Sequence, residues 1–149
     1  MSGSSLKIRL IMPRETHLLR QQVLRPLQSV EEMDWPGDQA AGSFHVGVDH
    51  GPVLVGVGTF IAEMHAALNG AKQYRLRGMA VHPEHRSRGI GGMILGFGIA
   101  QLRNGSADLV WCNARGTALP FYEKAGFSTV GLPFTIEGIG IHHLMYKRI

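Results

Sequence analysis

The stretch from Gln73 to Leu102 constrains the fold of this chain more than any other part of the sequence. An apolar strand pattern ends at Val81, a proline-containing turn follows, and the sequence Arg-Ser-Arg-Gly-Ile-Gly-Gly at residues 86–92 leads directly into an apolar helix pattern. Glycine permits a tight turn and lets backbone N–H groups approach a ligand closely. A helix that begins here adds unpaired N–H groups and the positive end of its dipole, and the two arginines add charge with bidentate geometry. The sequence therefore predicts a strand–turn–helix unit that binds phosphate at residues 86–92.

The class of phosphate ligand is narrowed by what this loop lacks. It has neither the Gly-x-Gly-x-x-Gly pattern followed by a ribose-binding acid nor the Gly-Lys-Ser/Thr of a P-loop. The formal net charge of +4 favours anionic partners. The basic residues are dispersed, however, and form no Lys/Arg run of the kind that binds nucleic acid. We therefore expect an anionic small ligand and no nucleic acid.

Size and composition fit a single domain over residues 1–149. A chain of 149 residues that is 44% hydrophobic can bury a substantial core. Its longest uncharged apolar stretches, residues 51–62 and 89–102, are shorter than the roughly 20 residues that a membrane span requires. Residues 1–5 contain no apolar signal core, and the single cysteine cannot form an internal disulfide. We expect a soluble cytoplasmic protein without membrane contact.

The other elements are placed from periodicity and turn residues. The predicted helices cover residues 15–27, 90–102 and 118–125, and residues 33–43 read as a loop. The predicted strands cover residues 6–11, 44–49, 53–61, 73–81, 109–113, 127–133 and 141–146. This order indicates a mixed α/β arrangement around one sheet. Gly96 and Gly98 weaken the long helix, so we expect close packing on one side of it.

Two segments resemble the motifs of the GNAT superfamily of acetyl-CoA-dependent N-acyltransferases. Residues 86–91 are similar to its Gln/Arg-x-x-Gly-x-Gly/Ala motif. The sequence Asn-Ala-Arg at residues 113–115 and Phe-Tyr-Glu-Lys-Ala-Gly-Phe at residues 121–127 are similar to its second motif. The resemblance covers residues 74–127, and the flanking elements match only by pattern. It implies a mixed, mostly antiparallel sheet of about seven strands, flanked by about four helices, with a splayed central strand pair.

The resemblance also implies a set of residues that bind the co-substrate, acetyl-CoA. The pantetheine arm would enter between the strands at residues 75–81 and 109–113 and pair with the first of them like an added strand. Asn113 would contact this arm, and Tyr122 would lie beside the thioester sulfur. The pairing residues would be Met79, Ala80 and Val81, and the pyrophosphate would be held by Arg86, Ser87, Arg88, Gly89, Ile90, Gly91 and Gly92.

The reaction requires an acid, a base and an oxyanion partner. A backbone N–H such as that of Met79 or Val81 can stabilise the tetrahedral oxyanion. The Tyr122 phenol can protonate the departing thiolate, so we expect it to be the general acid. Many family members carry a glutamate base on the strand before the loop, but Arg77 stands at about that place here. The base candidates are then Glu63, His82 or an ordered water.

Two arginines on the predicted strand at residues 73–81 indicate which chemical group the acceptor could carry. Arg75 and Arg77 alternate onto one face, where they would suit a carboxylate or phosphate on the substrate. Alternatively, they are solvated, or paired with Glu63 or Glu84. A bulge at Gly78 would change the direction in which they point.

Histidines and the cysteine offer no second chemistry in the sequence. Pro83 interrupts any helix that would align His82 with His85, and adjacent histidines at 142–143 face opposite sides of a strand. We therefore expect no metal. Cys112 lies in an apolar strand without a neighbouring base, which favours a place in the core.

The function expected from this sequence is transfer of an acetyl group from acetyl-CoA to the primary amine of a small or amino-acid-like acceptor by direct attack. Alternatives are acetylation of a protein N-terminus or lysine, a non-catalytic acyl-CoA-binding domain, or a structural domain with incidental glycines. The sequence leaves the acceptor, the acyl length and the choice between monomer and homodimer open.

Overall fold

Seven strands form one sheet in the computed structural model. The structure describes residues 5–149, so residues 1–4, for which the sequence predicted no signal peptide, lie outside the described part. The strand order is β1-β2-β3-β4-β5-β7-β6. All neighbours are antiparallel except β4 and β5, which are parallel. The mixed, mostly antiparallel sheet is therefore confirmed. The strands are β1 (Leu6–Ile11), β2 (Phe44–His50), β3 (Val53–Ala62), β4 (Gln73–Val81), β5 (Leu109–Arg115), β6 (Ser128–Ile136) and β7 (Gly140–Arg148).

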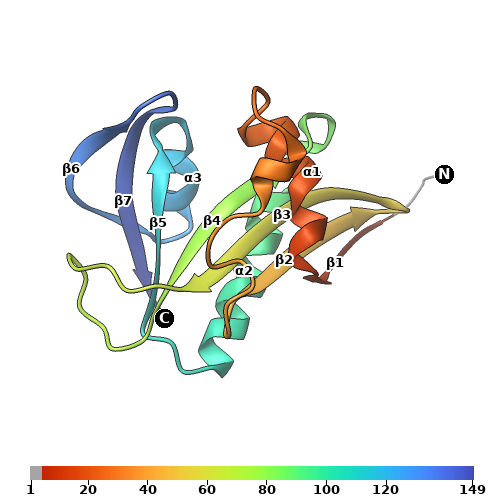
Figure 1. Ribbon diagram of the computed structural model, residues 1–149. Coiled ribbons are helices and arrows are strands. Elements are labelled where there is room, and N and C mark those ends of the chain that lie inside the picture. Colours follow the sequence, from red (N-terminus) through yellow and green to blue (C-terminus); the bar gives the residue numbers. More distant parts are fainter. Residues whose placement is uncertain (1–4) are drawn as a thin grey trace.

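Helices cover both faces of this sheet (Figure 1). The helix α2 (Ile90–Asn104) and the short α3 (Leu119–Lys124) share one face, where apolar side chains of α2 and of the strands form the main core. The opposite face carries α1 (His17–Leu19), which packs its Leu19 against Val57 of β3 in a smaller cluster. Among residues 5–149, no helix is long and apolar enough to cross a membrane.

The N-terminal helical segment is shorter and less regular than the predicted helix over residues 15–27. It begins with a 3-10 turn at Pro13–Thr16, continues through α1, and ends in a π-helical turn at Arg20–Leu24. It stops there because Arg25 precedes Pro26, and a residue before proline is excluded from the helical region; its φ and ψ are −139° and 60°. A further 3-10 turn at Val30–Met33 lies just ahead of the predicted loop.

The two glycines of α2 have different environments. A Cβ on Gly98 would lie 2.0 Å from the Phe60 ring, whereas one on Gly96 would meet nothing within 4 Å. The expected close packing on one side of the helix is therefore confirmed at Gly98, whereas Gly96 is exposed on the solvent side.

A β-bulge in β4 sets the direction of its side chains. Arg77 lies opposite Thr59 and Ala80 opposite Val57, so Gly78 and Met79 together face one residue of β3. Gly78 adopts a φ of +64°, a conformation that glycine tolerates. The bulge that the sequence left open is therefore present.

The neighbouring strands β4 and β5 are hydrogen-bonded at their beginnings. Gln73–Arg75 pair with Leu109–Trp111, and within the described chain no further register pairs join the two strands. The edge of β4 toward β5 is thus unpaired from Leu76 to Val81. The expected splay of the two strands stays a prediction.

Candidate active site

The loop at residues 86–92 has the geometry of an open helix N-terminus. Gly89 is the N-cap of α2 and has a φ of +77°. No side chain forms a capping hydrogen bond with the helix, and its first turn contains no acidic residue. A Cβ on Gly89 or Gly92 would meet nothing within 4 Å. Arg86, Ser87 and Arg88 are exposed just before the helix. Exposed N–H groups, a helix dipole and two cations therefore coincide, as the pyrophosphate of coenzyme A requires.

A cavity of about 460 Å³ lies beside this loop, between β4 and β5. It is lined by residues from both faces of the sheet: Leu76 and Cys112 point to the side of α2, whereas Arg77 and Asn113 point to the other side. Phe121 connects the cavity with the loop, because a Cβ on Gly91 would lie 3.3 Å from its ring. The cavity therefore lies at the unpaired part of the two strands, and Phe121 separates it from the start of α2.

The sequence-predicted residues are distributed around this cavity. Met79, Asn113 and Tyr122 line it. Ala80 and Val81 continue the unpaired edge of β4 outside the lining, and residues 86–92 lie at its side. The roles expected for them stay predictions.

Tyr122 is buried in α3, with its ring packed edge-on against Phe121 and Phe127 at centroid distances of 5.0 and 5.2 Å. No hydrogen bond joins its phenol to any other residue of 5–149. Burial, and to a lesser degree nearby Cys112, raises the pKa of the phenol well above its ordinary value. It is therefore protonated at neutral pH, as a proton donor must be.

Cys112 belongs to the core. It is buried, and burial raises the pKa of its thiol to about 12. A thiol in this state is a poor nucleophile at neutral pH, which agrees with the expectation from the sequence.

Arg75 and Arg77 share one face, and each has a carboxylate partner. Arg75 forms an ion pair of 3.4 Å with Glu63 and lies 5.1 Å from the centre of the Trp111 ring. Arg77 bonds Asp38 at 2.9 Å and the Pro36 carbonyl. The Glu63 pairing was among the expected alternatives, but the partner of Arg77 was not.

Asp38 is the centre of a buried polar network that sequence reasoning missed. Its carboxylate accepts hydrogen bonds from Arg20 at 2.6 and 3.1 Å, and both side chains are fully buried. Arg20 also donates to the Met33 carbonyl and the Thr59 hydroxyl and lies 4.0 Å from the centre of the Trp35 ring. This network holds the loop at residues 33–43 against β3 and β4.

His142 is a further residue that sequence reasoning missed, and it lines the same cavity. Its Nδ1 lies 2.8 Å from the Gly140 carbonyl oxygen, which can only accept, so Nδ1 carries the proton. In the neutral ring, Nε2 then keeps a lone pair that can take a proton. The sequence contained one indication of this role. Of two adjacent histidines in a strand, one must lie on the same face of the sheet as Asn113 and Arg115.

The base candidates from the sequence lie elsewhere. Neither Glu63 nor His82 lines the cavity. Glu63 is paired with Arg75, and Nδ1 of His82 accepts the Glu84 N–H at 3.1 Å. No carboxylate lines the cavity, which leaves His142 as the lining side chain suited to accept a proton.

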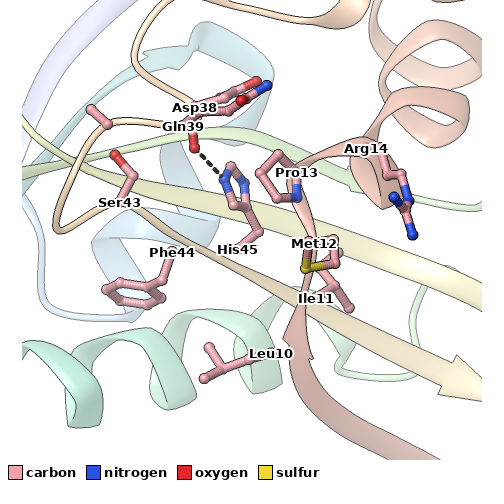
Figure 2. Close-up of a pocket in the computed structure, with 11 residues that line it drawn as sticks. Leu10, Ile11, Met12, Pro13, Arg14, Asp38, Gln39, Ser43, Phe44 and His45 are labelled. Atoms are coloured by element: carbon pink, nitrogen blue, oxygen red, sulfur yellow. Dashed lines mark hydrogen bonds between the residues drawn. The ribbon is translucent and has the colours of Figure 1, made fainter.

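A second cavity, of about 520 Å³, opens between the end of β1 and the loop before β2 (Figure 2). Its walls include the exposed side chains of Leu10 and Met12, and His45 at its base bonds the Asp38 carbonyl at 2.8 Å. It contains none of the residues that the sequence assigned to catalysis or binding. Of the residues that the sequence assigned to catalysis or binding, Met79, Asn113 and Tyr122 line the cavity between β4 and β5 instead.

One trio of potential metal ligands occurs among residues 5–149. Ligand atoms of His17, Asp34 and Asp38 lie within 4.8 Å of one another. The Asp38 oxygens are already bonded to two guanidinium groups, whose charge would repel a cation. The trio is therefore unsuited to a metal ion.

Comparisons with known proteins identify the family of this chain. The model of the acetyltransferase (GNAT) domain matches residues 41–129. An uncharacterized N-acetyltransferase of Bacillus subtilis strain 168, YitI, is 36% identical over 144 residues, covering 97% of each chain. The structure of FeeM, an N-acyl amino acid synthase from uncultured soil microbes, superposes with a TM-score of 0.80 at 12% identity, covering 97% of this chain and 91% of that one. An acyl-CoA N-acyltransferase from Pseudomonas aeruginosa gives a TM-score of 0.75 at 15% identity, covering 97% and 99%. The chain therefore belongs to the GNAT family of N-acetyltransferases, for which acetyl-CoA is the co-substrate.

Proposed function

We propose that this enzyme acetylates the primary amine of a small, amino-acid-like acceptor by direct attack of the amine on acetyl-CoA. The observation that carries the proposal is the composition of the cavity between β4 and β5. One side offers an unpaired strand edge and the Tyr122 phenol, and the other offers cations with no lining carboxylate. The first side suits a thioester and its pantetheine arm, and the second suits an anionic acceptor.

Coenzyme A would be held along the path that the sequence predicted. The N–H groups at the start of α2 and the exposed Arg86 and Arg88 would bind its pyrophosphate. The pantetheine arm would pass between β4 and β5, pair with the backbone at residues 79–81, and contact Asn113. This placement is supported by the unpaired edge of β4 and by a cavity lined from both faces of the sheet.

Tyr122 would act as the general acid. When the C–S bond of the thioester breaks, the phenol donates its proton to the sulfur, and the backbone N–H of Met79 or Val81 stabilises the oxyanion that precedes this step. Its place in the cavity lining and the absence of a hydrogen bond from its phenol to any other residue of 5–149 support this role.

His142 would accept the proton that the attacking amine loses. Its Nε2 has a lone pair because Nδ1 donates to the Gly140 carbonyl. It lies opposite Arg115 in the β5–β7 register, so it faces the acceptor side of the cavity. An ordered water could take the same proton, and substitution of His142 separates the two routes.

The nature of the acceptor is supported by the cavity and by one structural neighbour. A cavity of about 460 Å³ suits a small molecule. FeeM, which shares the fold, is an N-acyl amino acid synthase. A lysine-rich protein segment would be repelled by the arginines of this wall, which favours a small anionic amine over protein acetylation.

Binding of coenzyme A is tested by a pair of glycine substitutions in one helix. A Cβ at Gly92 or at Gly96 would meet no heavy atom within 4 Å outside the backbone of its own helix, so the free protein has room for a Cβ at both positions. Only Gly92 lies in the first turn of α2. Calorimetry should show weaker coenzyme A binding for Gly92→Val and unchanged binding for Gly96→Val.

Catalysis is tested separately by release of free thiol from acetyl-CoA across a panel of primary amines. Release that depends on a small amine supports the proposed function. Tight coenzyme A binding without amine-dependent release would instead favour the non-catalytic acyl-CoA-binding alternative. Equal coenzyme A affinity of the two valine variants would remove residues 86–92 from the binding site.

A further inference from the structure

We propose that Arg25 and Arg115 form a subsite that binds a carboxylate of the acceptor amine; this inference rests on the proposed function. The two residues come from distant segments. Arg25 follows the helical turn at Arg20–Leu24, and Arg115 ends β5. Both line the cavity between β4 and β5.

The two guanidinium groups converge on one backbone oxygen. Nη1 of Arg25 lies 2.9 Å from the Leu24 carbonyl oxygen, and Nη2 of Arg115 lies 3.4 Å from the same atom. Two like charges are thereby held side by side at the wall of a cavity. Such a pair is unfavourable unless an anion is bound between the charges or water screens them.

No acidic residue neutralises this pair. Within residues 5–149, neither Arg25 nor Arg115 forms an ion pair, whereas Arg75 and Arg77 are each bonded to a carboxylate. Burial, together with the nearby charge of Arg115, lowers the pKa of Arg25. The anion-binding role expected from the sequence for Arg75 and Arg77 therefore moves to the two arginines of the cavity lining that have no carboxylate partner among residues 5–149.

The chemistry of the pair selects a carboxylate. Each guanidinium presents five N–H donors in a planar fork, and the Leu24 carbonyl takes one donor from each. The remaining donors match the two oxygens of a carboxylate.

The position of the pair selects the length of the acceptor. Arg115 and His142 are opposite each other in the β5–β7 register, so their side chains are neighbours on one face. A carboxylate at Arg115 and an amine within reach of His142 are then separated by a few bonds, as in a small amino acid.

The test compares amine pairs that differ only in charge. Glycine is compared with glycinamide, and β-alanine with its amide, in Arg25→Gln, Arg115→Gln and Arg115→Lys. The control is Arg103→Gln, which removes an exposed arginine from the last turn of α2, outside the cavity. Each variant is expressed relative to the wild type for the same amine, so that differences in amine basicity cancel.

We expect both glutamine variants to lose about ten- to a hundredfold in kcat/KM for the carboxylate amines and little for the amides, because a charge-assisted hydrogen bond is lost. Arg115→Lys should retain part of the preference, because it keeps the charge but not the fork. Arg103→Gln should match the wild type. Unchanged coenzyme A affinity and thermal unfolding would show that the variants fold.

Two outcomes overturn the subsite: equal losses for an amine and its amide in the glutamine variants, or a wild-type kcat/KM, calculated for the unprotonated amine, that does not favour the carboxylate over the amide. A binding measurement separates this failure from failure of the proposed function. If no amine is acetylated, glutarate is titrated into the coenzyme A complex by calorimetry. Glutarate binding that is weakened in Arg115→Gln supports the subsite alone, and absence of glutarate binding to the wild type overturns it.

Discussion

Substitution of Asp38 by asparagine should destabilise the fold far more than the same change at Asp49. Each carboxylate accepts a hydrogen bond from an arginine at 2.6 Å, Asp38 from Arg20 and Asp49 from Arg9. The pairs differ in burial: the side chains of Arg20 and Asp38 are 0% exposed, whereas those of Arg9 and Asp49 are 45% and 20% exposed. The comparison therefore sets a buried carboxylate that also bonds Arg77 and the Trp35 N–H against an exposed one that bonds Arg9.

The expected loss in the free energy of unfolding follows from the groups that lose a charged partner in Asp38→Asn. Without the Asp38 charge, Arg20 stays buried with only neutral acceptors, which are the Met33 carbonyl, the Thr59 hydroxyl and the amide oxygen of the introduced asparagine, and Arg77 loses its charged partner at 2.9 Å. Removing one partner of a buried pair costs about 3–5 kcal/mol, a large part of the roughly 5–15 kcal/mol that stabilises a typical domain. The exposed pair should cost about 1 kcal/mol or less.

Urea unfolding at neutral pH measures both losses, and its pH dependence gives a second check. Burial by itself raises the pKa of Asp38, but the hydrogen bonds and charge of Arg20, with Arg77 and the Trp35 N–H, outweigh it and leave that pKa below its ordinary value. A lowered folded-state pKa contributes stability that is present above the unfolded pKa of about 4 and is lost as the pH falls through the folded value.

The difference in stability between wild type and Asp38→Asn should accordingly stay constant from neutral pH to about pH 5 and shrink in stronger acid. Equal losses for Asp38→Asn and Asp49→Asn, or a loss below about 1 kcal/mol for the buried variant, would refute the argument. A difference that grew in acid would contradict the direction assigned to the pKa of Asp38.

Three other predictions address catalysis and packing. Tyr122→Phe should lower kcat by a factor of about 10²–10⁴ with little change in acetyl-CoA affinity, since only a proton donor is removed. In steady-state kinetics, the loss should be smaller for a thioester whose leaving thiol is more acidic than that of coenzyme A. His142→Gln should lower kcat/KM for an unhindered amine by about 10²–10⁴, and normal activity would assign the proton to water instead. Gly98→Ala should lower the free energy of unfolding by about 1–3 kcal/mol, because its Cβ would lie 2.0 Å from the Phe60 ring. Gly96→Ala, in open space on the same helix, should raise it by about 1 kcal/mol, and thermal unfolding compares the two.

Local signals explain which parts of the structure could be predicted. The bounds of β1 and β4 match the predicted strands, and α2 begins at the predicted residue, because alternation, turn residues and the glycine loop are all encoded within a few positions. The irregular helical segment that ends at Leu24 was less predictable. There, a buried arginine and a proline override an amphipathic pattern.

Contacts between distant segments explain what could not be predicted. Arg77 and Asp38 are 39 residues apart, and nothing in either neighbourhood indicates that they meet. The convergence of Arg25 with Arg115 depends on how the segment after α1 packs against the end of β5. The place of His142 in the cavity depends on the register between β5 and β7. Periodicity gives the face of a strand but not its partner.

The bulge in β4 connects these local and distant effects. Without the extra residue, alternation would place Met79 on the face of Arg77; with it, Met79 joins Leu76 against the core, and Arg77 and Gly78 both face the acceptor side. The space above Gly78 is then filled by Arg20 and Trp35, each of which would lie 3.1 Å from a Cβ at that position. One strand thus supplies apolar packing below the sheet and an anchored cation above it, next to an edge that is unpaired from Leu76 onward. Because a side chain at position 78 would be strained at a φ of +64° and crowded by Arg20 and Trp35, we expect Gly78→Ala to lower the free energy of unfolding, which urea unfolding would measure.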